Sequence, residues 1–183
     1  MPVPSAAISV PISADDNILS KARELGIDFL ELAESEMERF SQDMEALNTR
    51  PASSEPRATE SITAIIELIS ALESGGHTYT IDGITYFDVT TFASFGKLSH
   101  LTNKEMIALA AERGGSPDDP RQRNALDFVL WQPSADDEPR WDSPFGPGRP
   151  GWHIECSAMS MDALGTTIDI HGGGGDLIFP HHE

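Results

Sequence analysis

Several residue types are scarce in this chain, and each scarcity excludes a class of protein. The 183 residues include a single cysteine, which excludes an internal disulfide framework and makes a cytoplasmic location the expectation. No apolar run approaches the roughly 20 residues that a membrane-spanning helix requires, so we expect no membrane partner. Residues 1–11 are small and apolar but contain no basic group, and a secretory signal peptide is therefore not predicted.

Basic residues are scarce as well. The chain has 12 Lys and Arg against 30 Asp and Glu, which gives a formal net charge of -18. Binding to phosphates requires clustered Lys and Arg, and no dense cluster occurs here. We therefore do not expect the chain to bind nucleic acid by itself. If RNA is its substrate, the positive surface must lie elsewhere.

The chain is long enough for one substantial domain, or for one domain with a smaller inserted module. Residues 1–13 contain three prolines and no periodic pattern, so we expect this segment to be irregular. Apolar residues then recur at helical spacing. Asp28 is the expected N-cap of the longest helix, because Glu31 stands three residues on, as in a capping box. The expected helices cover residues 15–25, 28–47 and about 60–73.

The period then changes to two, which is typical of strands. Asp82-Gly83 between two short alternating runs predicts a β-hairpin over residues 78–87. Thr102 and Glu105 form a capping box for a further helix. The remaining expected elements are a helix over 103–113, a strand over 127–131, a polar loop over 134–150, a helix over 152–164 and a buried strand over 166–170.

Two blocks near the end of the sequence hold most of its chemistry. Residues 148–159 contain the cysteine, and residues 169–183 contain four consecutive glycines and three of the six histidines. A thiolate and an imidazole, here Cys156 and His181, are ordinary zinc ligands, although a tetrahedral site needs four. A lone cysteine is also common as a small core residue. Because adjacent side chains diverge, we expect His182 to face away from any metal that His181 binds.

The four glycines would let a ligand come close to the backbone, because no Cβ stands in the way. Asp176 is suited to accept hydrogen bonds from ribose hydroxyls, and His171 to donate to a phosphate or carboxylate. The alternative is a plain glycine turn between a strand and a helix. Neither the Lys-Ser/Thr of a P-loop nor the Gly-x-Gly-x-x-Gly fingerprint is present.

Trp152 precedes Cys156 by four residues, so the two side chains share a face if this segment is helical. The indole then either forms the wall of a small pocket beside a metal or packs in the core. We expect His153 and Glu155 to point away from Cys156.

Together the two blocks resemble the cysteinyl-tRNA synthetase family, and the related cysteine ligases of mycothiol biosynthesis share most of them. The resemblance extends over about residues 14–183, with further matches at 40–44, 56–60, 127–131 and 141–144. It implies an α/β fold: a partial class I, Rossmann-like catalytic domain with an inserted α+β connective module. The implied parts are an irregular segment (1–13), a helical part of the catalytic core (14–60), the inserted module (61–142) and the zinc- and adenylate-site half (143–183).

The resemblance implies that cysteine is activated with ATP, accompanied by Mg²⁺, and is then transferred to tRNA. It makes Cys156 and His181 ligands of a zinc ion (Zn²⁺) that binds the substrate thiolate. Because zinc binds a thiol far better than a hydroxyl, serine would be rejected. The implied cysteine pocket contains Trp152 and His171, and the implied nucleotide site contains His171, Gly173, Gly174 and Asp176.

Several features of the family are missing from the sequence. These are a second zinc cysteine, the His-x-Gly-His-type and Lys-Met-Ser-Lys-Ser-type signatures, the tRNA-binding region, and a glutamate ligand that would fall at position 185. We therefore expect a central fragment that does not form cysteinyl-adenylate by itself. The alternatives are a ligase acting on an amino sugar in mycothiol biosynthesis and a non-catalytic truncated paralogue that binds a complementing chain. A zinc hydrolase, which needs three protein ligands, is the least favoured.

Overall fold

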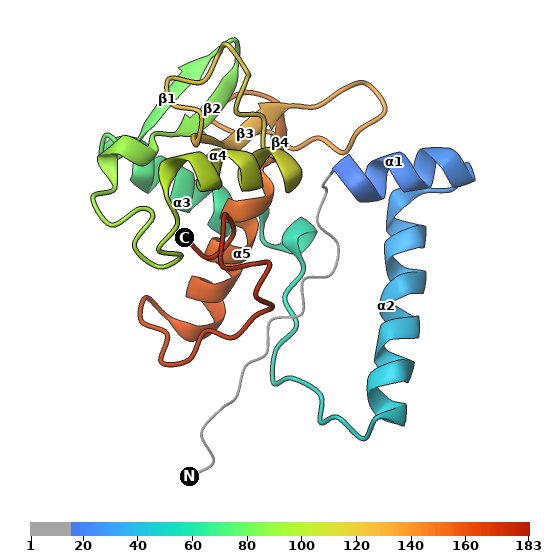
Figure 1. Cartoon of the computed structure of the whole chain (residues 1–183). Coiled ribbons are helices and arrows are strands. Elements are labelled where there is room, and N and C mark those ends of the chain that lie inside the picture. Colours follow the sequence, from blue (N-terminus) through green and yellow to red (C-terminus); the bar gives the residue numbers. More distant parts are fainter. Residues whose placement is uncertain (1–15) are drawn as a thin grey trace.

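The computed structural model describes residues 16–183, so the irregular segment expected over residues 1–13 lies outside the described residues. Within that range five α-helices accompany one four-stranded sheet (Figure 1). The helices are α1 (Asp16–Leu25), α2 (Phe29–Ala46), α3 (Ile62–Ser74), α4 (Asn103–Glu112) and α5 (Trp152–Leu164). The strands are β1 (Thr78–Ile81), β2 (Ile84–Phe87), β3 (Phe128–Pro133) and β4 (Gly148–Pro150). The five predicted helices are thus confirmed to within a few residues at their ends.

The strands lie in the order β1-β2-β3-β4, and every neighbouring pair is antiparallel. β1 and β2 form the predicted hairpin, in which Ile81 stands opposite Ile84. Asp82 and Gly83 have φ angles of 52° and 79°, the positive values that a two-residue turn of this handedness requires. The dipeptide therefore fixes both the turn and the register of the hairpin.

The prediction that residues 134–150 form a loop throughout is wrong at its end, where β4 pairs with residues 131–133 of β3. Gly148 comes so close to β3 that a Cβ on it would overlap the carbonyl oxygen of Gln132. A three-residue strand that contains a glycine and a proline has no alternating pattern, which is why the sequence does not reveal it. As an edge strand, β4 can contain proline, because one side of the strand makes no ladder hydrogen bonds.

The main core lies between the sheet and two helices. Ile65 and Ile69 of α3 are fully buried, as the predicted apolar face of this helix requires. They pack with Trp131 of β3 and Ile154 of α5 in one cluster. α3 and α5 also pack against each other, so α5 is held both by a helix and by the sheet.

A second cluster forms under α4. The capping box predicted at its start is present, with Thr102 and Glu105 bonded to each other's backbone N–H groups. Met106 and Ala110 of α4 pack with Phe179, which is 1% exposed although it comes from the far end of the chain. The end of the chain is therefore docked on α4.

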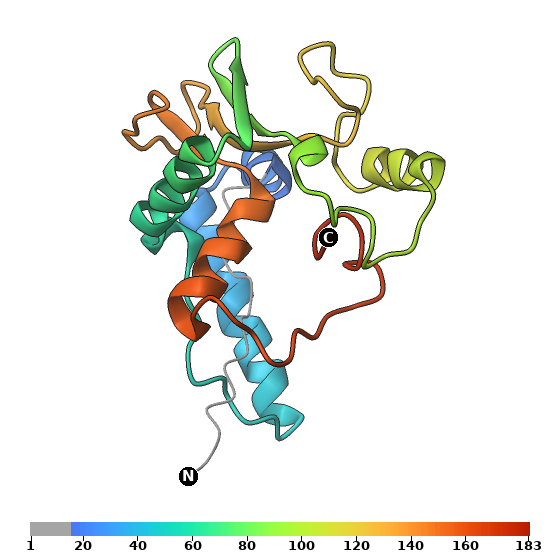
Figure 2. The ribbon, with the colours of Figure 1, turned by 90° about the vertical axis from the view of Figure 1, so that its left-hand side faces the viewer.

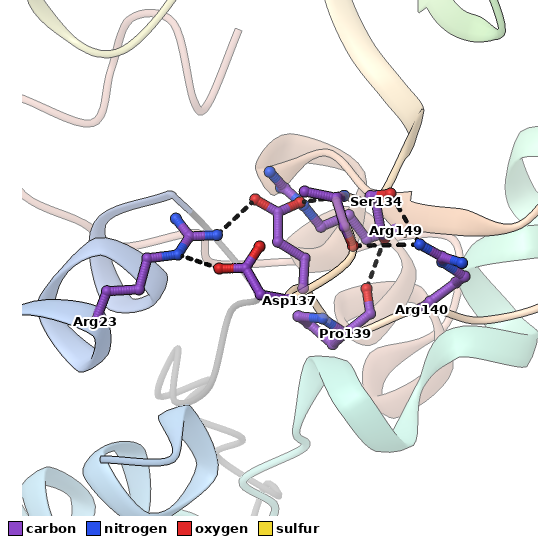
Figure 3. A network of polar contacts seen from close by, with 8 residues as sticks. Arg23, Ser134, Asp137, Pro139, Arg140 and Arg149 are labelled. Atoms are coloured by element: carbon purple, nitrogen blue, oxygen red, sulfur yellow. Dashed lines mark hydrogen bonds and ion pairs between the residues drawn. The ribbon is translucent and has the colours of Figure 1, made fainter. Parts of the chain in front are cut away.

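α1 and α2 extend to one side of the remaining elements (Figure 1). As predicted, Asp28 caps α2 by accepting a hydrogen bond from the N–H of Leu30 at 2.8 Å. Arg23 of α1 donates to Asp137 at 2.7 Å and to Glu138 at 3.2 Å, and Figure 3 shows the contacts that surround this link. Neither α2 nor any other helix of the described residues is long and apolar enough to cross a membrane.

The buried strand expected over residues 166–170 is not formed. This segment is exposed, and Ile170 retains 88% of its accessible surface. Within residues 16–183 no strand pairs with it, and an extended segment without a partner leaves its backbone groups to solvent. Figure 2 shows the chain leaving α5 and crossing to the side of α4 through this segment.

Candidate functional site

The first turn of α5 carries the aromatic and sulfur side chains of the candidate site. Gly151, the N-cap of α5, donates its N–H to the carbonyl of Leu130 at 3.0 Å. A Cβ on Gly151 would overlap the carbonyl oxygen of Val129, so only glycine lets the helix begin this close to β3. The helix that follows is confirmed over its whole predicted length. It places Trp152 and Cys156 one turn apart on the same face.

His181 lies directly against this first turn. Its ring is stacked on that of Trp152, with 4.3 Å between centroids and 12° between planes. Its Nδ1 lies 2.8 Å from Nδ1 of His153, a hydrogen-bonding distance. His153 in turn meets the ring of Phe128 edge-on at 5.2 Å. The site therefore joins α5 to a segment that is separated from it by an exposed connection.

His181 and His182 face different neighbours, as expected for adjacent side chains. The ring of His182 lies 4.0 Å from that of His171, centroid to centroid. A Cβ on Gly173 would overlap the ring of His182. Glycine at this position therefore lets the two histidine rings meet without a shift of the His182 side chain.

The glycine-rich loop is exposed from His171 to Asp176. A Cβ on Gly174 would overlap the carboxylate of Asp176, so this carboxylate folds back over the loop. The N–H of Leu177 donates to the carbonyl of Gly174 at 3.0 Å and closes a turn. The loop thus offers open backbone beside an exposed carboxylate, which is the arrangement expected for contacts to a nucleotide.

A cavity of 260 Å³ lies beside the site, between α3, the sheet, α5 and the end of the chain. Its walls are mostly apolar, with Leu72, Phe128 and Ile154 among them, and its polar groups include His153 and His181. Trp152 and His171, the predicted cysteine-pocket residues, lie outside the described lining of this cavity. Trp152 is half-buried and His171 is exposed.

Burial sets the protonation states of the site. It lowers the pKa of His153 to about 4, and the neighbouring His181 adds to this effect. Burial likewise lowers the pKa of His181 to about 4, so both imidazoles are neutral at pH 7. Burial, followed by the negative charge of Glu155, raises the pKa of Cys156 to about 12. A neutral imidazole is ready to bind a metal, whereas the thiol must first lose its proton.

Within residues 16–183 no group of three or more His, Cys, Asp or Glu side chains is arranged to hold a metal ion. Cys156 and His181 are the donor types that zinc prefers, and a closed tetrahedral site would need about two more ligands. In chemical type the two donors fit zinc, and they would supply two of the four ligands of a closed site.

Three contacting residues were not found from the sequence. His153 bonds to His181, and the expectation that it points away from Cys156 stays a prediction. Arg113 donates to the backbone carbonyls of Asp176 and Phe179. Glu183 accepts from the N–H groups of Leu98 and Ser99 at 2.8 and 2.9 Å. The contacts of Arg113 and Glu183 join distant parts of the chain, and no local sequence pattern predicts them.

Comparison of the sequence with known protein families identifies the class of domain to which the chain belongs. The family described as tRNA synthetases class I (C) catalytic domain matches residues 11–183. The chain therefore belongs to this family, which confirms the class I catalytic domain and the family that the sequence motifs indicated.

The names of the most similar relatives specify the substrate of each enzyme. A cysteine–tRNA ligase of Desulforamulus reducens is 50% identical over 169 residues, which cover 92% of this chain and 34% of that protein. A cysteine–tRNA ligase of Pelotomaculum thermopropionicum is 51% identical over the same shares. An L-cysteine:1D-myo-inositol 2-amino-2-deoxy-alpha-D-glucopyranoside ligase of Thermomonospora curvata is 46% identical, over 92% of this chain and 41% of its own length. The chain thus spans about a third of the length of the tRNA ligases that it matches.

Proposed function

We propose that this chain is a central part of the catalytic domain of a cysteine–tRNA ligase that activates cysteine with ATP. The observation that carries the proposal is the stacking of His181 on Trp152, one helical turn from Cys156, in a chain half identical to cysteine–tRNA ligases. In this proposal residues 14–60 and 143–183 belong to the catalytic core, and residues 61–142 form the connective module. The protein acts in the cytoplasm.

The proposed reaction has two steps. The carboxylate of cysteine attacks the α-phosphorus of ATP, and pyrophosphate leaves as cysteinyl-adenylate forms. A hydroxyl at the end of tRNA then takes the cysteinyl group, and AMP leaves. Mg²⁺ accompanies the ATP. The exposed glycine-rich loop supports a nucleotide-binding role for His171, Gly173, Gly174 and Asp176.

Cys156 and His181 are the proposed zinc ligands of this chain. When bound, zinc supplies selective binding of the substrate thiolate, because a hydroxyl is a much weaker ligand. Trp152 covers one face of the His181 ring, and His153 bonds to its Nδ1. Contacts of this kind orient a ligating imidazole, and their loss typically weakens metal binding by 10- to 100-fold. Trp152 and His171 border the proposed cysteine pocket.

The ligand assignment is tested by titrating the chain with Co²⁺, which reports a bound thiolate as a near-ultraviolet charge-transfer band. We expect the band in the wild-type chain, no band in Cys156→Ala, and a weaker band at equal cobalt concentration in His181→Ala. Ser157→Ala is the matched control, because its exposed hydroxyl neighbours Cys156 in the sequence. An unchanged band in Cys156→Ala contradicts the assignment.

The activity is tested by complementation. We expect no cysteine-dependent ATP–pyrophosphate exchange from the chain alone, because groups that stabilise the transferring phosphates supply much of the rate in such chemistry. Mixing it with polypeptides that supply the remaining parts of the Desulforamulus reducens ligase should restore exchange. The Cys156→Ala chain should not restore it. Exchange by the chain alone would show that the catalytic set is already complete.

An amino-sugar acceptor is the second candidate, and relatives named as ligases of that kind, at 46 and 47% identity, support it. Residues 56–60 and 169–171 favour tRNA, as do the identities of 50 and 51% to tRNA ligases. The complemented enzyme decides between them when it is offered tRNA or the amino sugar as acceptor. A chain that restores no exchange in any combination would favour a non-catalytic paralogue that binds a complementing chain.

A further inference from the structure

The segment that carries His181 is held in place from α4, on the opposite side from α5. Arg113 stands at the C-cap of α4, and its guanidinium donates to the carbonyl oxygens of both Asp176 and Phe179. These two carbonyls lie on either side of the turn that leads from the glycine-rich loop to His181. One side chain therefore grips both ends of this turn.

Two further contacts fix the same segment. The ring of Phe179 is buried with Met106 and Ala110 of α4. The carboxylate of Glu183 accepts hydrogen bonds from the N–H groups of Leu98 and Ser99, in the loop that precedes α4. The end of the chain is therefore anchored on residues 96–113 over its whole final turn.

The other connection of this segment is weak. Residues 165–170 lead from α5 to the glycine-rich loop and are exposed throughout. Within the described chain they belong to no helix or strand. The position of His181 against Trp152 and His153 is therefore set by the anchors on the α4 side and not by the short route along the chain from α5.

We propose that Arg113 is a positioning residue for the candidate site, which clamps the turn between the glycine-rich loop and His181. Both hydrogen bonds come from one nitrogen of Arg113, Nη1, and an arginine keeps its charge throughout the ordinary pH range. Hydrogen bonds from a charged donor are stronger than neutral ones. Through this clamp α4 sets where His181 meets α5. The inference rests on the proposed function only for the roles given to His181 and to the loop.

The test compares amide hydrogen exchange, followed by mass spectrometry, in the wild-type chain and in Arg113→Ala. Loss of a charged donor shared by two carbonyls should speed exchange in residues 174–183 by at least about tenfold. Exchange in α3 and in β3 should not change. The His181 Nδ1 resonance in an imidazole ¹H–¹⁵N correlation spectrum should also move toward that of a free neutral imidazole, because the bond to His153 loosens. Unchanged exchange and resonances in Arg113→Ala would overturn the proposal.

Arg140→Ala is the matched control. Arg140 also donates to two backbone carbonyls, those of Ser134 and Ala135, but it lies in a different loop. It should leave residues 174–183 as protected as in the wild type. Equal loss of protection in both variants would show a general loss of stability and would overturn the clamp.

Arg113→Lys keeps a charged donor on a shorter side chain and remains informative if the alanine variant does not fold. It should give hydrogen exchange between that of the wild-type chain and that of a chain without the clamp. Wild-type protection in the lysine variant would support the clamp, because an ammonium can also donate to both carbonyls, whereas protection of residues 174–183 that is the same in every variant of residue 113 would overturn it. These measurements need no cysteine, ATP or metal. A negative result in the cobalt titration or in the ATP–pyrophosphate exchange assay therefore does not affect the clamp. A negative result in the hydrogen-exchange test likewise does not affect the proposed function.

Discussion

At the scale of single residues, Tyr79 and Asp127 form a buried polar pair outside the candidate site. The hydroxyl of Tyr79 donates to the carboxylate of Asp127 at 2.7 Å and accepts from the N–H of Arg123 at 2.9 Å. Asp127 also accepts from the N–H groups of Val89 and Asn124, at 3.0 and 2.9 Å. The hairpin, the start of β3 and the loop before it thus meet at one buried phenol.

Burial raises the pKa of Tyr79 well above its usual range, and the nearby Asp127 carboxylate adds to this effect. Because the folded-state pKa exceeds the unfolded value of about 10, the contribution of Tyr79 to stability is complete below pH 10 and is lost as the pH rises beyond it. We expect the free energy of unfolding in urea to fall above pH 10. In Tyr79→Phe it should be about 1–2 kcal/mol lower at pH 8 and should fall less at alkaline pH.

Tyr86→Phe is the control, since these two are the only tyrosines of the sequence. The hydroxyl of Tyr86 lies 3.5 Å from Asp119, so the bond lost there is weaker and the change at pH 8 should be smaller. Equal pH profiles for the wild-type chain and Tyr79→Phe would contradict the assignment.

At the scale of elements, the start of α5 connects the sheet to the candidate site. Gly151→Ala places a methyl group against the carbonyl of Val129 and forces the helix away from β3. We expect this substitution to lower the free energy of unfolding by roughly 2–3 kcal/mol, measured by urea denaturation. Gly172→Ala is the control, because its new methyl group meets no atom within 4 Å, and it should change stability by less than about 0.5 kcal/mol. Similar losses in both variants would argue against the close approach.

Elements that carry their own local signal were predicted well from the sequence. Asp28, Thr102 and Asp82-Gly83 fix a cap or a turn with a few neighbouring residues, and the structure confirms all three. β4 has no such signal, because a glycine that allows close approach looks the same in sequence as a glycine in a loop. Residues 166–170 have the composition of a strand, but within the described residues no strand pairs with them.

In the candidate site too, contacts within one element were predictable from the sequence and contacts between distant elements were not. Trp152 and Cys156 lie on one helix, so their shared face follows from their spacing. The stacking of Trp152 on His181 depends on how α5, α4 and the end of the chain pack together. The clamp by Arg113 joins residues 63 positions apart, and hydrophobic periodicity does not predict such a contact. The zinc and nucleotide roles of these residues stay predictions.

At the scale of the whole molecule, charge decides what the chain binds by itself. Its net charge of -18 repels a polyanion, and its few basic residues are often paired, as Arg23 is with Asp137 and Arg149 with Glu138. We expect no binding to labelled tRNA at 0.15 M salt, up to a chain concentration of about 100 µM, by fluorescence anisotropy. The Pelotomaculum thermopropionicum relative is the positive control. Micromolar binding by this chain would contradict the charge argument.

The corner between α1 and α2 has a mechanical consequence. α2 has 18 residues and is therefore about 27 Å long, and the ion pair of Arg23 with Asp137 near this corner is exposed. Dissolved salt weakens exposed ion pairs by screening, and the Debye length is roughly 10 Å at 0.1 M ionic strength. A rotation of about 10° at the corner would move the far end of α2 by roughly 5 Å. The length of α2 would therefore turn a small rotation at this corner into a displacement large enough to follow with a label at Asn48, just beyond the end of the helix.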